Sequence, residues 1–230
     1  MIVFLRRAVK VKSRKTLFRQ GLRRHCPTRA GCHAALKLPT PNLILASASS
    51  YRRALLERLG LPFATVAPQV DERGLPGETA ARAALRLAEA KARAVAVSPR
   101  ALVIGSDQVA ELDGEHLGKP GDHRTAVRQL RAMRGREVIF HTAVCLYSAG
   151  SGKVQTANVP TMVKFRSVSD AQIERYLELE QPYDCAGSAR VEMLGIALAE
   201  RIVADDPTAL IGLPLIALVS MLQAEGVAVI

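Results

Sequence analysis

The stretch LILASASSYRRALLERLG, residues 43–60, predicts the unit from which the fold is built. Its first four residues form a short apolar run, which is typical of a buried strand. A Ser-rich turn follows, and Leu55, Leu56 and Leu59 then recur on one face of a helix that begins near Tyr51 and ends at Gly60. A strand that passes through a short turn into a helix is characteristic of α/β folds.

Outward from this stretch, apolar spacing continues to alternate between strand and helix periods. The predicted strands are 63–67, 102–105 with a resumption at 109–112 after a polar break, 138–147, 154–165 and 195–203. The predicted helices are 78–97, 124–133, 170–179 and a last helical region over 206–225 that is interrupted by Gly212 and Pro214. The fold class is therefore α/β, with a long mixed β-sheet flanked by helices and its two longest strands paired.

The charge of the chain is concentrated at its beginning. The 230 residues hold 32 Lys and Arg against 21 Asp and Glu, a net charge of +11. Residues 1–41 contain eleven of the basic residues and no acidic one, which leaves 21 of each sign in residues 42–230. We expect a disordered basic extension over 1–41 and one neutral domain over 42–230 that binds no nucleic acid.

The extension itself has three interpretations. Its Arg-rich, acid-free composition is compatible with an organellar transit peptide, although serine is scarce. A run of basic residues also suits a nucleic-acid-binding arm. We favour the third interpretation, an upstream segment without a folded role, because no amphipathic period supports the other two.

Membrane and extracellular classes are disfavoured. The longest apolar stretch, 209–221, is interrupted by Gly212 and Pro214 and is shorter than the roughly 20 residues that a spanning helix needs. Four cysteines are too few and too scattered for a disulfide scaffold. We therefore expect a cytoplasmic protein that does not associate with membranes.

The Ser-rich turn is a candidate anion site. Ser47 and Ser49 precede the first helix, whose initial N–H groups are unpaired and carry partial positive charge. Arg52 and Arg53 stand in its first turn, where a cation is unfavourable for the helix dipole unless an anionic ligand offsets the cost. A capped helix with solvated arginines explains the same residues equally well.

Acidic residues and lysines supply the rest of a candidate site. Asp107 follows an apolar strand on a Gly-Ser break, a position suited to metal binding or general base catalysis, although turn aspartates are common. Glu72 follows the preceding strand, and Lys91 and Lys119 are further cations. This set suits a nucleoside triphosphate with a divalent metal. The chain has no G-x4-G-K-[ST] phosphate loop and no evident Ser-His-Asp arrangement.

Seven motifs in one order give these residues a context. They are LASASSYRRALL (45–56), VDE (70–72), LAEAKA (87–92), IGSDQV (104–109), LGKP (117–120), CAGS (185–188) and IGLPL (211–215). Over nearly all of residues 42–230 the chain resembles the Maf-type nucleotide pyrophosphatases. The resemblance implies a fold similar to that of the inosine-triphosphate pyrophosphatases, with a long mixed sheet, two lobes, a cleft between them and often a homodimer.

The resemblance also implies an activity, the hydrolysis of a nucleoside triphosphate to the monophosphate and diphosphate with Mg²⁺ or Mn²⁺. Asp107 matches the proton acceptor that activates water, and together with Glu72 it matches the metal site. The positions that match phosphate contacts are Ser47, Ser49, Arg52, Lys91 and Lys119.

Three further positions, Tyr51, Gln108 and Glu192, resemble the branch of the family that acts on 7-methyl-GTP. The chemistry agrees, since 7-methylguanine is cationic and is attracted to an aromatic face and to a carboxylate. Tyr51 stands where Trp is usual, and Ser50 and Met193 also depart from the branch pattern. The alternatives are the branch that acts on dTTP and UTP, or a non-catalytic division regulator that binds nucleic acid.

Overall fold

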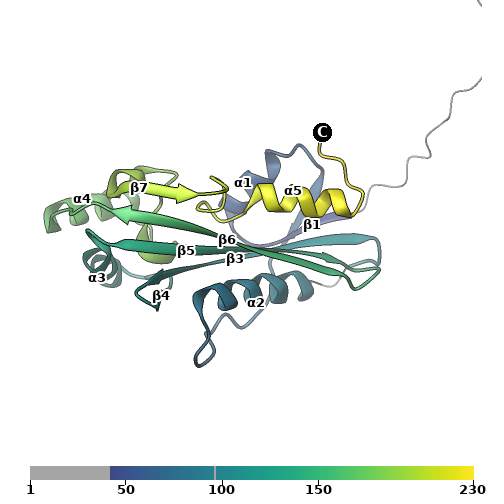
Figure 1. Ribbon diagram of the computed structural model, residues 1–230, viewed down its shortest axis with the longest axis horizontal. Coiled ribbons are helices and arrows are strands. Elements are labelled where there is room, and N and C mark those ends of the chain that lie inside the picture. The colour runs from purple at the N-terminus through teal and green to yellow at the C-terminus, as the bar shows by residue number, and fades with distance from the viewer. Residues whose placement is uncertain (1–41, 96) are drawn as a thin grey trace, which may run out of the picture. The chain divides into compact units, whose positions relative to one another are not determined.

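One mixed β-sheet runs through the body of the protein (Figure 1). The computed structural model describes residues 42–95 and 97–230, so the predicted basic extension lies outside the described residues. The strand order is β2-β1-β3-β5-β6-β7, with β4 paired to β3. The strands are β1 (Asn42–Ala46), β2 (Phe63–Val66), β3 (Ala101–Leu112), β4 (Glu115–Leu117), β5 (Glu137–Ser148), β6 (Val154–Phe165) and β7 (Ala199–Ala204).

The sheet is parallel at one side and antiparallel at the other. Strands β2, β1 and β3 are parallel, whereas β3, β5, β6 and β7 pair antiparallel. The helices are α1 (Ser50–Glu57), α2 (Ala80–Arg93), α3 (His123–Met133), α4 (Asp170–Glu180) and α5 (Leu215–Ala224), with short 3₁₀ turns η1 (Ala186–Ser188) and η2 (Leu194–Leu198). The predicted α/β class and mixed sheet are confirmed. No helix within 42–95 or 97–230 combines the length and the apolarity needed to cross a membrane.

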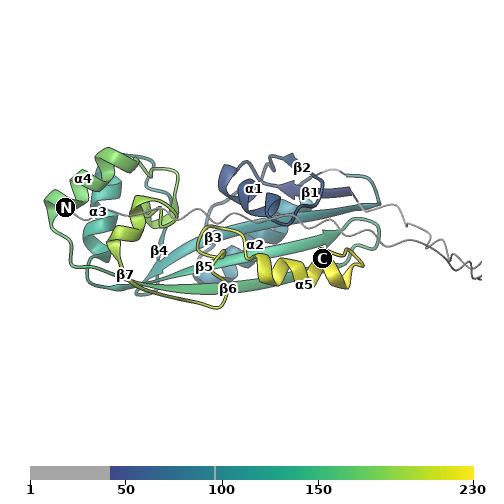
Figure 2. The same ribbon diagram turned by 90° about the horizontal axis from the view of Figure 1, so that it is seen from above.

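Helices cover both faces of the sheet, and the core divides accordingly. Helix α2 packs alanines closely onto one face of β3 and β5. On the opposite face, α1 and α5 cover one end of the sheet, and α3 and α4 cover the other (Figure 2). The long strands β3, β5 and β6 continue through both ends, so the two halves share one sheet.

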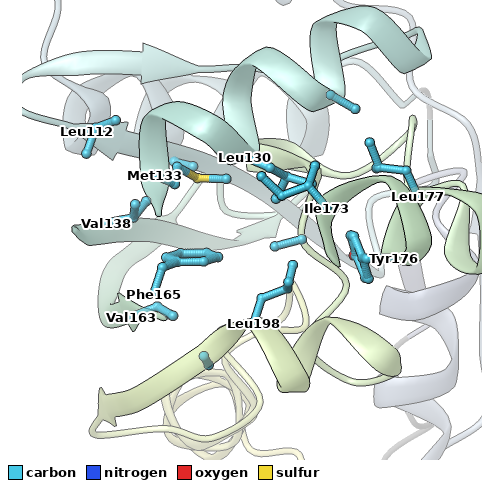
Figure 3. Packing of buried hydrophobic residues seen from close by; sticks show 14 of the residues in the cluster. Leu112, Leu130, Met133, Val138, Val163, Phe165, Ile173, Tyr176, Leu177 and Leu198 are labelled. Carbon is cyan, nitrogen blue, oxygen red and sulfur yellow. The ribbon is translucent and has the colours of Figure 1, made fainter. Parts of the chain in front are cut away.

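The end of the sheet that α3 and α4 cover has a hydrophobic core of its own (Figure 3). Leu130 and Met133 of α3 meet Ile173 and Leu177 of α4 above Phe165 of β6, and all five side chains are buried. This packing follows from the helical spacing of the apolar residues in both helices. The core gives the loop between α4 and β7, which carries part of the site, a firm support.

Three sequence-based predictions of the elements were wrong. The expected break at Gly105-Ser106 is absent, because β3 is continuous and Ser106 donates a hydrogen bond to the Ala143 carbonyl inside the sheet. Residues 195–198 form η2 rather than strand, and β7 begins only at Ala199. The last helix begins at Leu215, since the segment from Asp206 to Gly212 is a series of turns.

Gly105 lets helix α2 approach the sheet. A Cβ built at this position lies 2.0 Å from the Ala88 carbonyl oxygen and 2.8 Å from the Ala92 nitrogen, both of which are backbone atoms of α2. Backbone atoms of a packed helix cannot move aside as a flexible side chain does. Gly105 therefore determines the distance between α2 and β3, the two elements that carry Lys91 and Asp107.

We predict that Gly105→Ala destabilises the protein by about 3 kcal/mol, because overpacking must push α2 away from the sheet. Urea unfolding followed by circular dichroism measures the change. Gly74→Ala is the matched control, since a Cβ at Gly74 meets nothing within 4 Å. Equal stabilities of the two variants would contradict the close approach.

Candidate active site

The candidate site lies at a gap in the sheet. On one side β3 pairs with β5 along nearly its whole length. On its other side it pairs with β1 only as far as Gly105 and with β4 only from Ala110 onward. Residues 106–109 thus have no strand beside them on that edge, at the point where β1 ends and the chain turns into α1. This gap exposes Asp107 and Gln108 to a cleft.

The cleft is a cavity of about 720 Å³, a size suited to a nucleotide. Every residue predicted for the site lines this cavity: Ser47, Ser49, Tyr51, Arg52, Glu72, Lys91, Asp107, Gln108, Lys119 and Glu192. These residues come from the turn between β1 and α1, from α1, the loop after β2, α2, β3, the loop after β4 and the loop between η1 and η2. The structure therefore brings the whole predicted set together.

Lys91 forms the centre of the site. Its Nζ lies 2.6 Å from Asp107 Oδ1 and 2.7 Å from Glu72 Oε1, so one ammonium joins two carboxylates. The side chains of Lys91 and Asp107 are 7% and 10% exposed, whereas Glu72 is half exposed. Burial alone would raise the pKa of Glu72, but the hydrogen bond and charge of Lys91 bring it below its ordinary value. Lys91 therefore contacts two carboxylates in the structure, whereas the resemblance matches it to a phosphate contact.

The sequence context of Asp107 suggested the carboxyl end of a strand, but the structure places this residue elsewhere. It stands in the middle of β3 and points toward α2. The position is tolerated because Lys91, on the buried face of α2, compensates the charge that β3 carries into the interior. The turn-aspartate alternative is thereby excluded.

The Ser-rich turn has the capping geometry expected of a helix start. Ser49 is the N-cap of α1 and accepts a hydrogen bond from the Arg52 N–H at 3.4 Å. Ser47 is buried, and its hydroxyl accepts the Ser49 N–H at 3.1 Å. The Ser47 hydroxyl can donate its own proton to a ligand in the cleft. Lys119 is exposed and also lines the cleft.

The two arginines of the first turn have different environments. Arg52 points into the cleft, where its Nε donates to the Gly212 carbonyl at 2.8 Å and its charge interacts with Asp107 and Glu72. Burial lowers the pKa of Arg52, and the two carboxylates oppose this shift. Arg53 is exposed and pairs with Glu57 at 3.1 Å. The anion-site interpretation thus applies to Arg52 alone.

The cleft also carries the three predicted specificity residues. Tyr51 and Glu192 line it, and the pKa of Glu192 is raised mainly by burial. The side chain of Gln108 points toward the 209–212 loop, and its amide donates to the carbonyls of Ala209 at 3.2 Å and Leu210 at 3.0 Å. Gln108 therefore holds the 209–212 loop, whose residues 210–212 line the cleft.

The family model described as Maf-like protein matches residues 42–225. The chain belongs to the Maf-like protein family.

Relatives within the Maf-like family carry consistent names. A protein of Thiobacillus denitrificans named 7-methyl-GTP pyrophosphatase is 60% identical over 192 residues, which are 83% of this chain and 96% of the relative. A protein of Ralstonia nicotianae with the same name is 59% identical over 184 residues, 80% of this chain and 95% of the relative. A solved HAM1 protein of Coxiella burnetii is a distant match, with 14% identity, a TM-score of 0.38 and coverage of 55% of this chain and 74% of that one.

Several residues that shape this Maf-like site were not predicted from the sequence. Ser106 donates to the Gly212 carbonyl at 2.9 Å, the same carbonyl that accepts from the predicted Arg52, and so joins β3 to α1 and the 209–212 loop. Asp206, which is buried, accepts the Ile216 N–H at 2.8 Å and caps the start of α5. Arg190 lies behind Tyr51. Hydrogen bonds between distant segments determine these roles, and no local pattern reports them.

We predict that Arg52→Lys lowers the free energy of unfolding by about 1–2 kcal/mol, because the Nε donor to Gly212 is lost from a half-buried site. Arg53→Lys is the matched control and changes it by less than about 0.5 kcal/mol, since its side chain is 62% exposed. Chemical denaturation measures both. A larger loss at Arg53 would refute the assignment of Arg52 to the cleft.

Proposed function

We propose that the protein is a nucleoside triphosphate pyrophosphatase that hydrolyses 7-methyl-GTP to 7-methyl-GMP and diphosphate and so removes a modified nucleotide from the cytoplasmic pool. The observation that carries the proposal is Asp107, a buried carboxylate held by Lys91 at 2.6 Å inside a nucleotide-sized cleft. The names of the relatives support the substrate.

The triphosphate binds against the cleft residues that supply hydrogen-bond donors and positive charge. The hydroxyl of Ser47 and the start of α1 donate to phosphate oxygens, as helix N-termini commonly do. Arg52 and Lys119, which line the same cleft, add positive charge. This placement stabilises the negative charge that develops on the leaving diphosphate.

Asp107 acts as the proton acceptor. Water attacks the α-phosphorus, its oxygen forms the new P–O bond, and its proton passes to the carboxylate as the α–β anhydride bond breaks. The ammonium of Lys91, 2.6 Å from Asp107 Oδ1, holds the carboxylate in place for this step. General base catalysis of this kind contributes roughly 10²–10⁴-fold.

A divalent cation, Mg²⁺ or Mn²⁺, belongs to the same proposal. Glu72 and Asp107 offer hard oxygen ligands, and Mg²⁺ is commonly held by one or two carboxylates together with substrate phosphates. Within residues 42–95 and 97–230 no cluster of three or more His, Cys, Asp or Glu ligands is found, so the donor set fits a metal shared with the substrate. The ion would neutralise phosphate charge.

The methylated base binds against Tyr51 and Glu192. The ring of Tyr51 attracts a cationic base, an interaction worth about 0.5–2 kcal/mol. The carboxylate of Glu192 accepts hydrogen bonds from the N1–H and N2–H₂ edge of guanine, and its charge favours the methylated form. Gln108 keeps the 209–212 loop in place beside the base.

We predict that diphosphate release from 7-methyl-GTP exceeds that from GTP, dTTP and UTP by at least about tenfold in kcat/KM, because only this base is cationic. A coupled diphosphate assay measures all four. Similar rates with all four would overturn the assignment, and a preference for dTTP and UTP would assign the protein to the pyrimidine branch.

In the same assay Asp107→Asn lowers kcat by roughly 10²–10⁴-fold, because the proton acceptor is lost. Asp71→Asn, in the loop beside Glu72, is the control and retains activity, since its exposed carboxylate pairs with Arg73. An active Asp107→Asn enzyme would contradict the mechanism.

A further inference from the structure

One contact joins two elements beside the residues proposed to bind the base. The guanidinium carbon of Arg190 lies 5.4 Å from the ring centroid of Tyr51. Tyr51 belongs to α1, which packs with α5 over one end of the sheet. Arg190 lies between η1 and η2, beside α4 at the other end. The stack therefore links the two halves of the core across the cleft.

The backbone of Arg190 is held rigidly. Its N–H donates to the hydroxyl of Tyr176 at 2.9 Å, and Tyr176 is buried on α4. Its carbonyl accepts the N–H groups of Met193 at 3.1 Å and Gly195 at 3.0 Å. A Cβ at Gly195 would lie 2.4 Å from that carbonyl oxygen, so the segment is folded tightly around Arg190.

The side chain of Arg190 is also constrained. The guanidinium lies 3.5 Å from Glu180 and 3.2 Å from Asp184, and the side chain is 18% exposed. Burial alone would lower the pKa of Arg190, but contacts with Cys185, Tyr51 and Asp184 raise it. The two carboxylates fix the planar group against the ring and balance its charge. Such a supporting contact is what keeps a binding surface preorganised.

Tyr51 lines the cavity, whereas in the described part of the chain Arg190 is outside that lining. We propose that Arg190 is a positioning residue that supports the ring of Tyr51 from behind, so that the ring forms a fixed wall for the base of the substrate. The inference rests on the proposed function and adds to it a residue that acts on base binding through Tyr51.

The test compares KM, kcat and inhibition by inorganic triphosphate, which has no base. With 7-methyl-GTP as substrate, Arg190→Gln raises KM by about three- to tenfold and changes kcat by less than twofold, because only the base wall is disturbed. Inhibition by inorganic triphosphate is unchanged. In a Tyr51→Leu background Arg190→Gln has no further effect, since the ring that it supports is absent.

Two further variants complete the test. Arg190→Lys keeps a cation for Glu180 and Asp184, and its KM lies between those of the wild type and Arg190→Gln. Arg201→Gln, an exposed arginine of β7, is the control and leaves KM unchanged. If Arg190→Gln fails to fold, a rise in KM for Arg190→Lys that disappears in the Tyr51→Leu background carries the same conclusion.

An unchanged KM, an equal loss of inhibition by inorganic triphosphate, or an effect that persists without Tyr51 would overturn the inference. Failure of the proposed function looks different, because the wild-type enzyme itself then releases no diphosphate from 7-methyl-GTP.

Discussion

The ammonium of Lys91, held between Asp107 and Glu72, is the interaction on which the cleft depends. It joins α2, β3 and the loop after β2. A buried carboxylate without a partner is strongly unfavourable, and removing one member of a buried ion pair costs about 3–5 kcal/mol. The pair is possible only because Gly105 allows α2 to lie against the sheet. Gly105 and Lys91 together thus allow β3 to carry the Asp107 carboxylate into the interior.

The gap in the sheet gives this ion pair access to a ligand. Where β1 ends and β4 has not begun, the edge of β3 is open, and the N-terminus of α1 faces it. The 209–212 loop closes one side through Gly212, which accepts hydrogen bonds from Arg52 and Ser106. The other side is closed by the stack of Arg190 on Tyr51. The cations and the aromatic ring therefore line one cavity, as a nucleotide requires.

The sequence predicted the class of fold and the members of the site better than their arrangement. Period and capping signals identify α1, α3 and α4, and the motifs identify Asp107, Lys91 and Tyr51. The sequence did not reveal that Asp107 lies within a continuous strand, because a polar residue in β3 is stable only with a lysine from α2. Arg190 and Ser106 were missed for a similar reason, since their partners are far away in the chain. The start of α5 was predicted too early because Asp206, which caps it, was taken as its first residue.

The most direct measurement of the central interaction is a double-mutant cycle in unfolding free energy between Lys91→Met and Asp107→Asn. If the ammonium compensates the buried carboxylate, Lys91→Met alone is destabilising by about 3 kcal/mol or more, and adding Asp107→Asn recovers much of the loss. The coupling is then at least about 2 kcal/mol. Losses that add to within about 0.5 kcal/mol would show that the two groups act independently and would contradict the account.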